Sequence, residues 1–388
     1  ALYLQDGKAL PVGTRFHNPD LAQTYRDLAR GGVKAFYEGP IAASMVAAVN
    51  HPPANPGVTV LAGSLSMADL KDYEARLRQP VRSSYRGYEV YGMPAPSSGG
   101  IAVAQALNIL ETFELTGKSR ADIEHLYLEA SRLAFADRNA YVADEEFIDV
   151  PKDGLLSKAY ARERARLIGA VAAPGKVAAG DPYPFEADPS VPLRPQPRPL
   201  AQESTHTTHL AVADREGNVV AYTFTIEDWG GSGIVVPGRG FLLNNELTDF
   251  DFSGPHPNVP EAFKRPRSSM SPTIVLKDGA PAFTIGSPGG STIITTVLQT
   301  IVNHIDLGMS LADALAAPRL SQRNGDTTLV ETLLQFPASA PARALEAKGH
   351  KVRAVDGGAV GGYQGILFTR DPRLPAPVLD RISVTEDR

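Results

Sequence analysis

The first half of the chain repeats its apolar residues every three to four positions, the spacing that places them on one face of an α-helix. The longest such pattern covers residues 121–142, and its shared face is formed by Ile123, Leu126, Ala130 and Leu133. Asn18–Pro19 suits the start of a helix that stops at Gly31–Gly32, and Ser66–Asp69 has the form of a capping box. We expect helices over residues 19–31, about 33–50, 67–77, about 100–115 and 121–142.

Beyond residue 207 the pattern changes to strands. Residues 209–214 with 219–226, and residues 273–277 with 282–285, are apolar runs that enclose polar turns, which predicts two β-hairpins. All four runs are nearly continuously apolar, as is typical of sheets covered on both faces. An apolar helix is expected over residues 291–305. The chain should therefore be an α+β protein in which layered sheets lie between helices.

A proline-rich segment separates the two halves, from about residue 172 to 202. Its prolines exclude a helix or a central strand. An interdomain linker and a functional loop both fit this composition, since a structureless stretch of this length is usually one or the other.

Composition narrows the possible chemistry. The net charge of the 388 residues is −5, with no basic stripe and no apolar run long enough to span a membrane, so neither a nucleic-acid partner nor a membrane span is expected. There is no cysteine, which excludes disulfides, thiolate nucleophiles and Cys-ligated zinc. Ala1 begins a strand-like run without an initiator Met, and we expect the chain to come from within a longer one.

The candidate chemistry lies where the proline-rich segment meets the first strand, in Glu203–His209. Its threonines could simply be strand residues, because threonine favours strands. A threonine hydroxyl becomes a useful nucleophile when a neighbouring base takes its proton, and a chain-terminal amine can be that base. Cutting the bond before the threonine would create such an amine, which titrates near pH 8. Spacing alone leaves Thr205, Thr207 and Thr208 as alternatives.

The strand sequence that follows resembles the start of the small subunit of γ-glutamyltranspeptidases. The resemblance lies in Thr207-Thr-His209-Leu-Ala-Val-Ala-Asp214 and in Gly217–Thr223. It implies that Thr207 is the nucleophile, that the chain cuts itself between His206 and Thr207, and that the Thr225 hydroxyl supports that of Thr207.

Three further motifs continue the resemblance, and each fits the chemistry it implies. Carboxylates suit the α-ammonium of a γ-glutamyl substrate, hydroxyls suit its α-carboxylate, and adjacent glycines at a helix start suit an oxyanion. The implied residues are Glu227, Glu246 and Asp249 for the ammonium, Ser268 and Ser269 for the carboxylate, and Gly289 and Gly290 for the oxyanion hole. A single acid, a Ser-Ser pair or a Gly-Gly pair is an ordinary loop feature. Only the combination of these motifs makes the resemblance to the family specific.

The resemblance implies a four-layer αββα N-terminal-nucleophile hydrolase. Residues 1–206 would be the C-terminal part of the large subunit and residues 207–388 the small subunit, a heterodimer cut from one precursor. The implied reaction is ping-pong hydrolysis or transfer of γ-glutamyl groups from glutathione and similar amides to water, amino acids or peptides. No metal or organic cofactor is expected, and the family suggests export to the periplasm or outside the cell.

Departures from the family pattern give additional expectations. The upstream Arg that clamps the substrate α-carboxylate in the family has no counterpart in this chain. Trp229 and Gly230 stand where the family has a different order of apolar and aromatic residues. We expect Trp229 to pack inside the protein or line a pocket. Residues 252–260 are shorter than the lid loop of some members, which predicts an open site that accepts bulky γ-glutamyl compounds, including poly-γ-glutamate.

Two other functions stay open. A glutaryl or cephalosporin-type acylase of the same fold would not need Glu227, Glu246 and Asp249. A catalytically silent scaffold would explain the absent Arg and would remain uncut.

Overall fold

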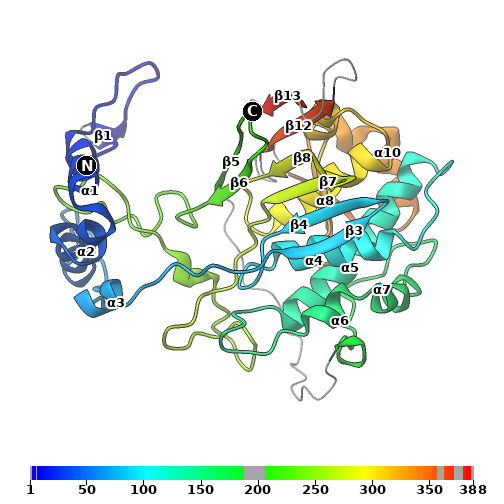
Figure 1. Cartoon of the computed structure of the whole chain (residues 1–388), viewed down its shortest axis with the longest axis horizontal. Coiled ribbons are helices and arrows are strands. Elements are labelled where there is room, and N and C mark those ends of the chain that lie inside the picture. The colour runs from blue at the N-terminus through cyan, green and yellow to red at the C-terminus, as the bar shows by residue number, and fades with distance from the viewer. Residues whose placement is uncertain (1, 6, 188–205, 356–361, 371–378, 386–388) are drawn as a thin grey trace. The chain divides into compact units, whose positions relative to one another are not determined.

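A computed structural model describes residues 2–5, 7–187, 206–355, 362–370 and 379–385 (Figure 1). The chain divides into two compact units. The smaller unit comprises residues 1–77 and 226–246, and the larger comprises residues 78–225 and 247–388. Among the described residues, no helix combines the length and apolarity that crossing a bilayer requires. The proline-rich segment is described only as far as residue 187.

The smaller unit is helical. Its elements are β1 (Leu4–Gln5), β2 (Lys8–Ala9), α1 (Pro19–Tyr37), α2 (Pro40–Asn50) and α3 (Met67–Lys71). Asn18 caps α1 as expected, and the helix kinks at Gly32, which has a φ of 62°. The predicted continuous helix over residues 33–50 is wrong, because Gly39–Pro40 starts a new helix. The capping box at Ser66 is confirmed, but α3 ends well before residue 77.

The larger unit is built on a six-stranded sheet in the order β13-β12-β8-β7-β4-β3. Its strands are β3 (Val81–Tyr85), β4 (Tyr88–Gly92), β7 (Thr273–Lys277), β8 (Ala280–Gly286), β12 (Gln364–Arg370) and β13 (Leu379–Thr385). A hairpin forms a second antiparallel sheet from β5 (Thr208–Ala213) and β6 (Val219–Phe224), and β9 (Leu320–Ser321), β10 (Thr328–Glu331) and β11 (Val352–Val355) form a third sheet.

Helices cover one face of the six-stranded sheet (Figure 1). The helices of this unit are α4 (Gly99–Leu110), α5 (Arg120–Tyr141), α6 (Lys152–Leu156), α7 (Lys158–Ala165), α8 (Thr292–Ile305), α9 (Leu311–Ala316) and α10 (Ala340–Ala347). Short 3₁₀ helices are η1 (Tyr183–Phe185), η2 (Glu246–Asp249) and η3 (Leu333–Ala338). Phe283 and Ile285 of β8 belong to the same buried apolar cluster as residues of α4, α5 and α8.

The β5–β6 hairpin packs on the other face of the sheet. Successive strand residues point to opposite faces, so Gly286 faces away from the helices that Ile285 contacts. A Cβ atom on Gly286 would lie 2.2 Å from the His209 ring of β5, which shows how closely the two sheets approach. The expected α+β arrangement of stacked antiparallel sheets and helices is thus confirmed. The elements that were not predicted include β3, α6, α7, α10 and the strands β9 to β13.

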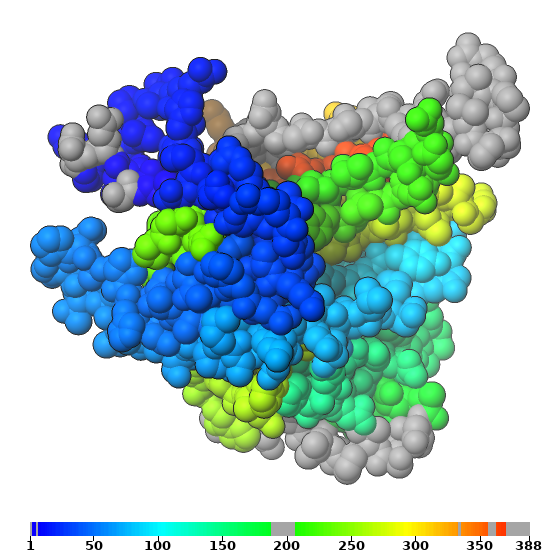
Figure 2. Space-filling model, turned by 60° about the vertical axis from the view of Figure 1, so that its left-hand side comes forward, coloured from blue at the N-terminus to red at the C-terminus, as the bar shows by residue number. Residues whose placement is uncertain are grey.

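One expectation about the hairpin is wrong. Both of its faces were expected to be covered, yet the outward side chains of Val212, Val220, Tyr222 and Phe224 are each more than 40% exposed. The register explains why these four side chains share one face. Val212 lies directly opposite Val220, and every second residue of a strand points to the same side, so Tyr222 and Phe224 face the same way as Val220. This hairpin, coloured green, reaches the molecular surface in Figure 2.

Candidate active site

Strand register gathers four candidate segments at one end of the six-stranded sheet. Gly92 at the end of β4 pairs with Thr273 at the start of β7, and Thr273 pairs with Ile285 near the end of β8. The segments that follow β4, precede β7 and follow β8 therefore leave the sheet side by side. They carry Ser97–Ser98, Ser268–Ser269 and Gly289–Gly290, respectively. The fourth segment is the start of β5, which reaches the same end through the contact of His209 with Gly286.

Thr207 lies just before β5, at the head of the hairpin, and is half-buried. Its Oγ donates a hydrogen bond to Thr225 Oγ at 3.2 Å, and Thr225 Oγ donates to the backbone carbonyl of His206 at 2.9 Å. That carbonyl belongs to the bond expected to be cut. The structure therefore brings together the three residues that the family resemblance assigned to self-cleavage, and the Thr225 hydroxyl donates to the carbonyl of that bond.

The hairpin is fixed on the sheet by His209, which is 1% exposed. Its Nδ1 lies 2.7 Å from Thr223 Oγ, on the paired strand, and burial lowers the pKa of its imidazole to about 4. His209 is therefore neutral at physiological pH. Because it follows Thr207 by two residues and contacts Gly286, it sets the distance between the nucleophile's strand and the strand that leads to the glycine pair.

Buried neutral histidines predict acid sensitivity of the fold. His209 titrates near 6.5 when unfolded and near 4 when folded, so its stability contribution is complete above pH 6.5 and falls by about 3 kcal/mol by pH 4. His350 adds to this effect, because burial and the nearby His125 lower its pKa to about 3. Urea unfolding between pH 7 and 4 should show the loss. His350→Gln should flatten the profile, whereas His51→Gln, at an exposed position, should leave it unchanged.

The glycine pair lies at the start of α8. Gly289 has a φ of 129° and Gly290 a φ of 55°, conformations that suit glycine and disfavour other residues. The carbonyls of both accept hydrogen bonds from the first turn of the helix, from Thr292 and Ile293. The N–H groups that precede Thr292 lie at the positive end of the helix dipole, so this turn can stabilise an oxyanion. Arg323 donates to the neighbouring Ser291 hydroxyl.

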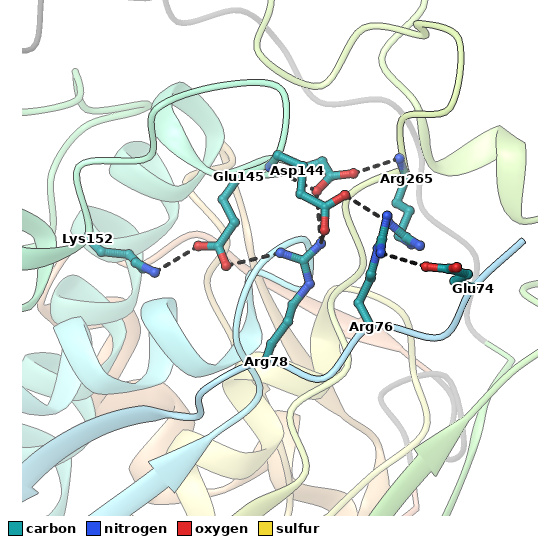
Figure 3. A network of polar contacts seen from close by, with 8 residues as sticks. Glu74, Arg76, Arg78, Asp144, Glu145, Lys152 and Arg265 are labelled. Atoms are coloured by element: carbon teal, nitrogen blue, oxygen red, sulfur yellow. Dashed lines mark hydrogen bonds and ion pairs between the residues drawn. The ribbon is translucent and has the colours of Figure 1, made fainter.

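Ser268 and Ser269 are buried in the segment before β7. This segment is anchored by Asp144, whose side chain is fully buried and accepts a hydrogen bond from the Arg265 backbone N–H at 2.9 Å. Arg78 bridges Asp144 and Glu145 at 3.3 and 3.1 Å, and Lys152 pairs with the other Glu145 oxygen at 2.8 Å (Figure 3). The alternating charges hold the loop that presents the two serines.

The predicted ammonium-binding acids divide between the two units. Glu227 and Glu246 belong to the smaller unit, where Asn245 Nδ2 donates to Glu227 Oε2. Burial, reinforced by the Glu227 charge, raises the pKa of Glu246 to about 7. Asp249 belongs to the larger unit, where Asn258 Nδ2 donates to its backbone carbonyl at 2.7 Å. The charges of the two carboxylates repel each other, which disfavours ionisation of Glu246. A bound cation would offset this repulsion and stabilise the ionised pair.

One expectation about a single residue is wrong, and one buried residue was missed. Trp229 does not pack inside the protein, because its side chain is 81% exposed. Sequence reasoning also missed Arg138, a fully buried charge on α5 that contacts Ser269. The available signal was that α5 carries apolar residues around most of its circumference, so a charged residue within it needed a buried partner. Among the described residues, no cluster of three or more His, Cys, Asp or Glu could hold a metal ion.

Stacked antiparallel sheets with a threonine just before the first strand of the second sheet are the arrangement of N-terminal-nucleophile hydrolases. The solved cephalosporin acylase from Bacillus halodurans shares this fold with a TM-score of 0.82 and 30% identity, covering 99% of this chain and 64% of that chain. A model of the γ-glutamyltranspeptidase family matches residues 1–382. The chain therefore belongs to the γ-glutamyltranspeptidase family.

Curated relatives carry two kinds of name. The glutathione hydrolase proenzyme of Bacillus subtilis subsp. natto is 41% identical over 321 residues, 82% of this chain and 53% of the relative. That of Escherichia coli (strain K12) is 38% identical over 391 residues, 96% and 62% of the two chains. The acylase ACY 1 proenzyme of Pseudomonas sp. (strain SE83) is 38% identical over 379 residues, again 96% and 62%. This chain thus spans between half and two thirds of these relatives' lengths.

Proposed function

We propose that the protein cuts its own backbone before Thr207 and then hydrolyses or transfers γ-glutamyl groups through that threonine. The observation that carries the proposal is the chain of hydrogen bonds from Thr207 Oγ to Thr225 Oγ and on to the His206 carbonyl oxygen. The names of the relatives agree with it, because several are proenzymes of glutathione hydrolases.

Self-cleavage would begin at the His206 carbonyl. Thr207 Oγ attacks the carbonyl carbon, and the Thr225 hydroxyl, which already donates to the carbonyl oxygen, stabilises the charge that develops there. Collapse breaks the C–N bond, passes the hydroxyl proton to the nitrogen and leaves an ester on Thr207. Water then hydrolyses the ester, which frees the Thr207 hydroxyl beside the α-amine already formed and leaves a carboxylate on His206.

The mature site would then work in two steps. The Thr207 α-amine takes the proton of its own hydroxyl, the oxygen attacks the substrate γ-carbonyl, and the Gly289–Gly290 turn binds the oxyanion. The leaving amine departs with the proton, and water or an acceptor amine releases the γ-glutamyl group from the ester. Residues 1–206 and 207–388 would form the two subunits, and export stays a prediction from family resemblance.

The substrate head group separates this function from its main alternative. Relatives named acylases make a glutaryl or cephalosporin-type acylase the second candidate. A glutaryl group has the same carboxylate as a γ-glutamyl group but lacks the ammonium. The pair Glu227 and Glu246, with its raised pKa at Glu246, favours a substrate that brings a positive charge.

Paired substrates test this choice. The full-length protein should cleave γ-glutamyl-p-nitroanilide at least about tenfold more efficiently than glutaryl-p-nitroanilide, the usual size of one charge-assisted contact. Glu246→Gln should remove that preference, and Glu216→Gln, which removes an equal charge from the exposed β5–β6 turn, should not. Equal turnover of both anilides by the unaltered protein would instead support the acylase.

The raised pKa of Glu246 adds a pH signature. Its carboxyl titrates near 7, so it loses its charge as the pH falls through that value. The kcat/KM for γ-glutamyl-p-nitroanilide should fall below pH 7 mainly through a higher KM, because a protonated acid no longer attracts the ammonium. The glutaryl substrate should lack this rise in KM, whereas protonation of the Thr207 α-amine lowers kcat for both substrates.

A scaffold without activity is tested by denaturing electrophoresis. The proposed enzyme gives two fragments that separate at Thr207, and mass spectrometry should find Thr207 as a new N-terminus. A single uncut band together with no turnover would support the scaffold.

A further inference from the structure

We infer that Arg138 is a positioning residue that makes Ser269 a directed donor for the substrate α-carboxylate, an inference that rests on the proposed function. Arg138 lies on α5 and its side chain is fully buried. Its Nη2 donates to Ser269 Oγ at 2.7 Å and its Nε donates to Ser98 Oγ at 2.8 Å. Nη1 donates to the Asn139 side-chain oxygen at 3.0 Å. The guanidinium therefore contacts two of the segments that leave the same end of the sheet.

Those two segments are also bonded directly to each other. Ser98 donates to the Ser268 carbonyl through both its N–H and its Oγ, each at 2.8 Å. Ser97 Oγ donates to the Met270 carbonyl at 2.6 Å. Gly99 completes the approach, because a Cβ atom there would lie 2.2 Å from Ser271 Oγ. Arg138 thus donates to both members of a tightly joined pair of loops, whose serines were assigned by resemblance alone.

The direction of the hydrogen bond decides what Ser269 can do. A guanidinium carries only donors, so the Ser269 oxygen must be the acceptor of the Arg138 contact. The serine's own proton is then donated in another direction. A serine without such a neighbour can turn its hydroxyl either way, so the arginine makes Ser269 a preorganised donor and adds positive potential behind it. An anion is the ligand that such a donor favours.

A buried guanidinium that acts through a serine adds positive charge near a bound carboxylate without touching the substrate. Arg138 is accordingly a positioning residue for carboxylate recognition.

Competition by three small acids tests the inference. L-Glutamate has both α groups of the substrate, glutarate lacks the ammonium, and 4-aminobutyrate lacks the α-carboxylate. In the full-length protein, Arg138→Lys should raise the inhibition constants of glutamate and glutarate about tenfold and change that of 4-aminobutyrate less than twofold. With γ-glutamyl-p-nitroanilide, KM should rise while kcat stays nearly constant, because the carboxylate contact is equal in ground and transition states.

A merely structural role predicts a different result. Loosened loops would weaken all three acids alike and lower kcat, and that outcome would overturn the inference. If the unaltered protein neither cuts itself nor turns over γ-glutamyl-p-nitroanilide, the proposed function fails instead, so the two failures are distinguishable.

Arg138→Lys could also prevent folding, and a milder pair of variants covers that case. Ser98→Ala removes one acceptor of Arg138 and leaves Ser269 in place. It should raise the glutarate inhibition constant several-fold in the normal background and have no further effect when combined with Ser269→Ala. Additive effects of Ser98→Ala and Ser269→Ala would show that Arg138 does not act through Ser269.

Discussion

Replacing Thr207 with alanine should leave the protein as one uncut chain and abolish turnover of γ-glutamyl-p-nitroanilide. Alanine has no oxygen to attack the His206 carbonyl, so the precursor bond survives and no α-amine forms. We expect turnover to fall at least about a thousandfold, since both the nucleophile and its base are lost together. Denaturing electrophoresis and the anilide assay measure the two effects separately.

Matched variants make this prediction specific. Thr208→Ala changes an exposed threonine on the next residue, at the start of β5, and should allow both cleavage and turnover. Thr207→Ser retains the hydroxyl and should restore cleavage at a reduced rate. Cleavage that persists in Thr207→Ala, or disappears only in Thr208→Ala, would show that another threonine is the nucleophile.

Gly290→Ala should lower kcat by a factor of about 100 to 1000 with little change in KM. The residue has a φ of 55°, where a Cβ atom costs about 1–2 kcal/mol, so the turn would shift to relieve the strain. A shift displaces the N–H donors from the developing oxyanion, and one lost donor raises the barrier by about 3–4 kcal/mol. Steady-state kinetics with γ-glutamyl-p-nitroanilide measure the effect.

Gly279→Ala separates catalysis from backbone strain. Gly279 has a φ of 75° in the β7–β8 turn, at the opposite end of the strands, with open space where its Cβ atom would lie. Its replacement should lower the stability by a similar amount and leave kcat unchanged. Equal losses of kcat in both variants would mean that Gly290 acts only through folding.

Local sequence was sufficient for elements whose signals lie within a few residues. The apolar face within residues 121–142 became α5, and Ser66 caps α3 through the expected contact with Asp69. It failed where a break was overlooked, since Gly39–Pro40 divides the helix expected over residues 33–50. It also missed β3, which forms a hairpin with the next strand, and β12, which pairs with β8, a strand distant in the sequence.

The same distinction between local sequence and tertiary contacts applies to the candidate site. The sequence supplied the order of hydroxyl, acid and glycine motifs, and through their resemblance to a family it named residues such as Thr207 and Gly290. It could not show that Thr225 donates to the His206 carbonyl or that Ser269 accepts from Arg138, because these contacts join residues 19 and 131 positions apart.

What the sequence determined by itself was the chemistry available at each position and the local elements, because propensity, capping and alternation act over a few residues. Only the tertiary structure decided which end of the sheet collects the motifs, which face of the β5–β6 hairpin is exposed and which way a hydroxyl must donate. Strand register and buried donor-acceptor pairing set those features, and both depend on contacts between residues far apart in the chain.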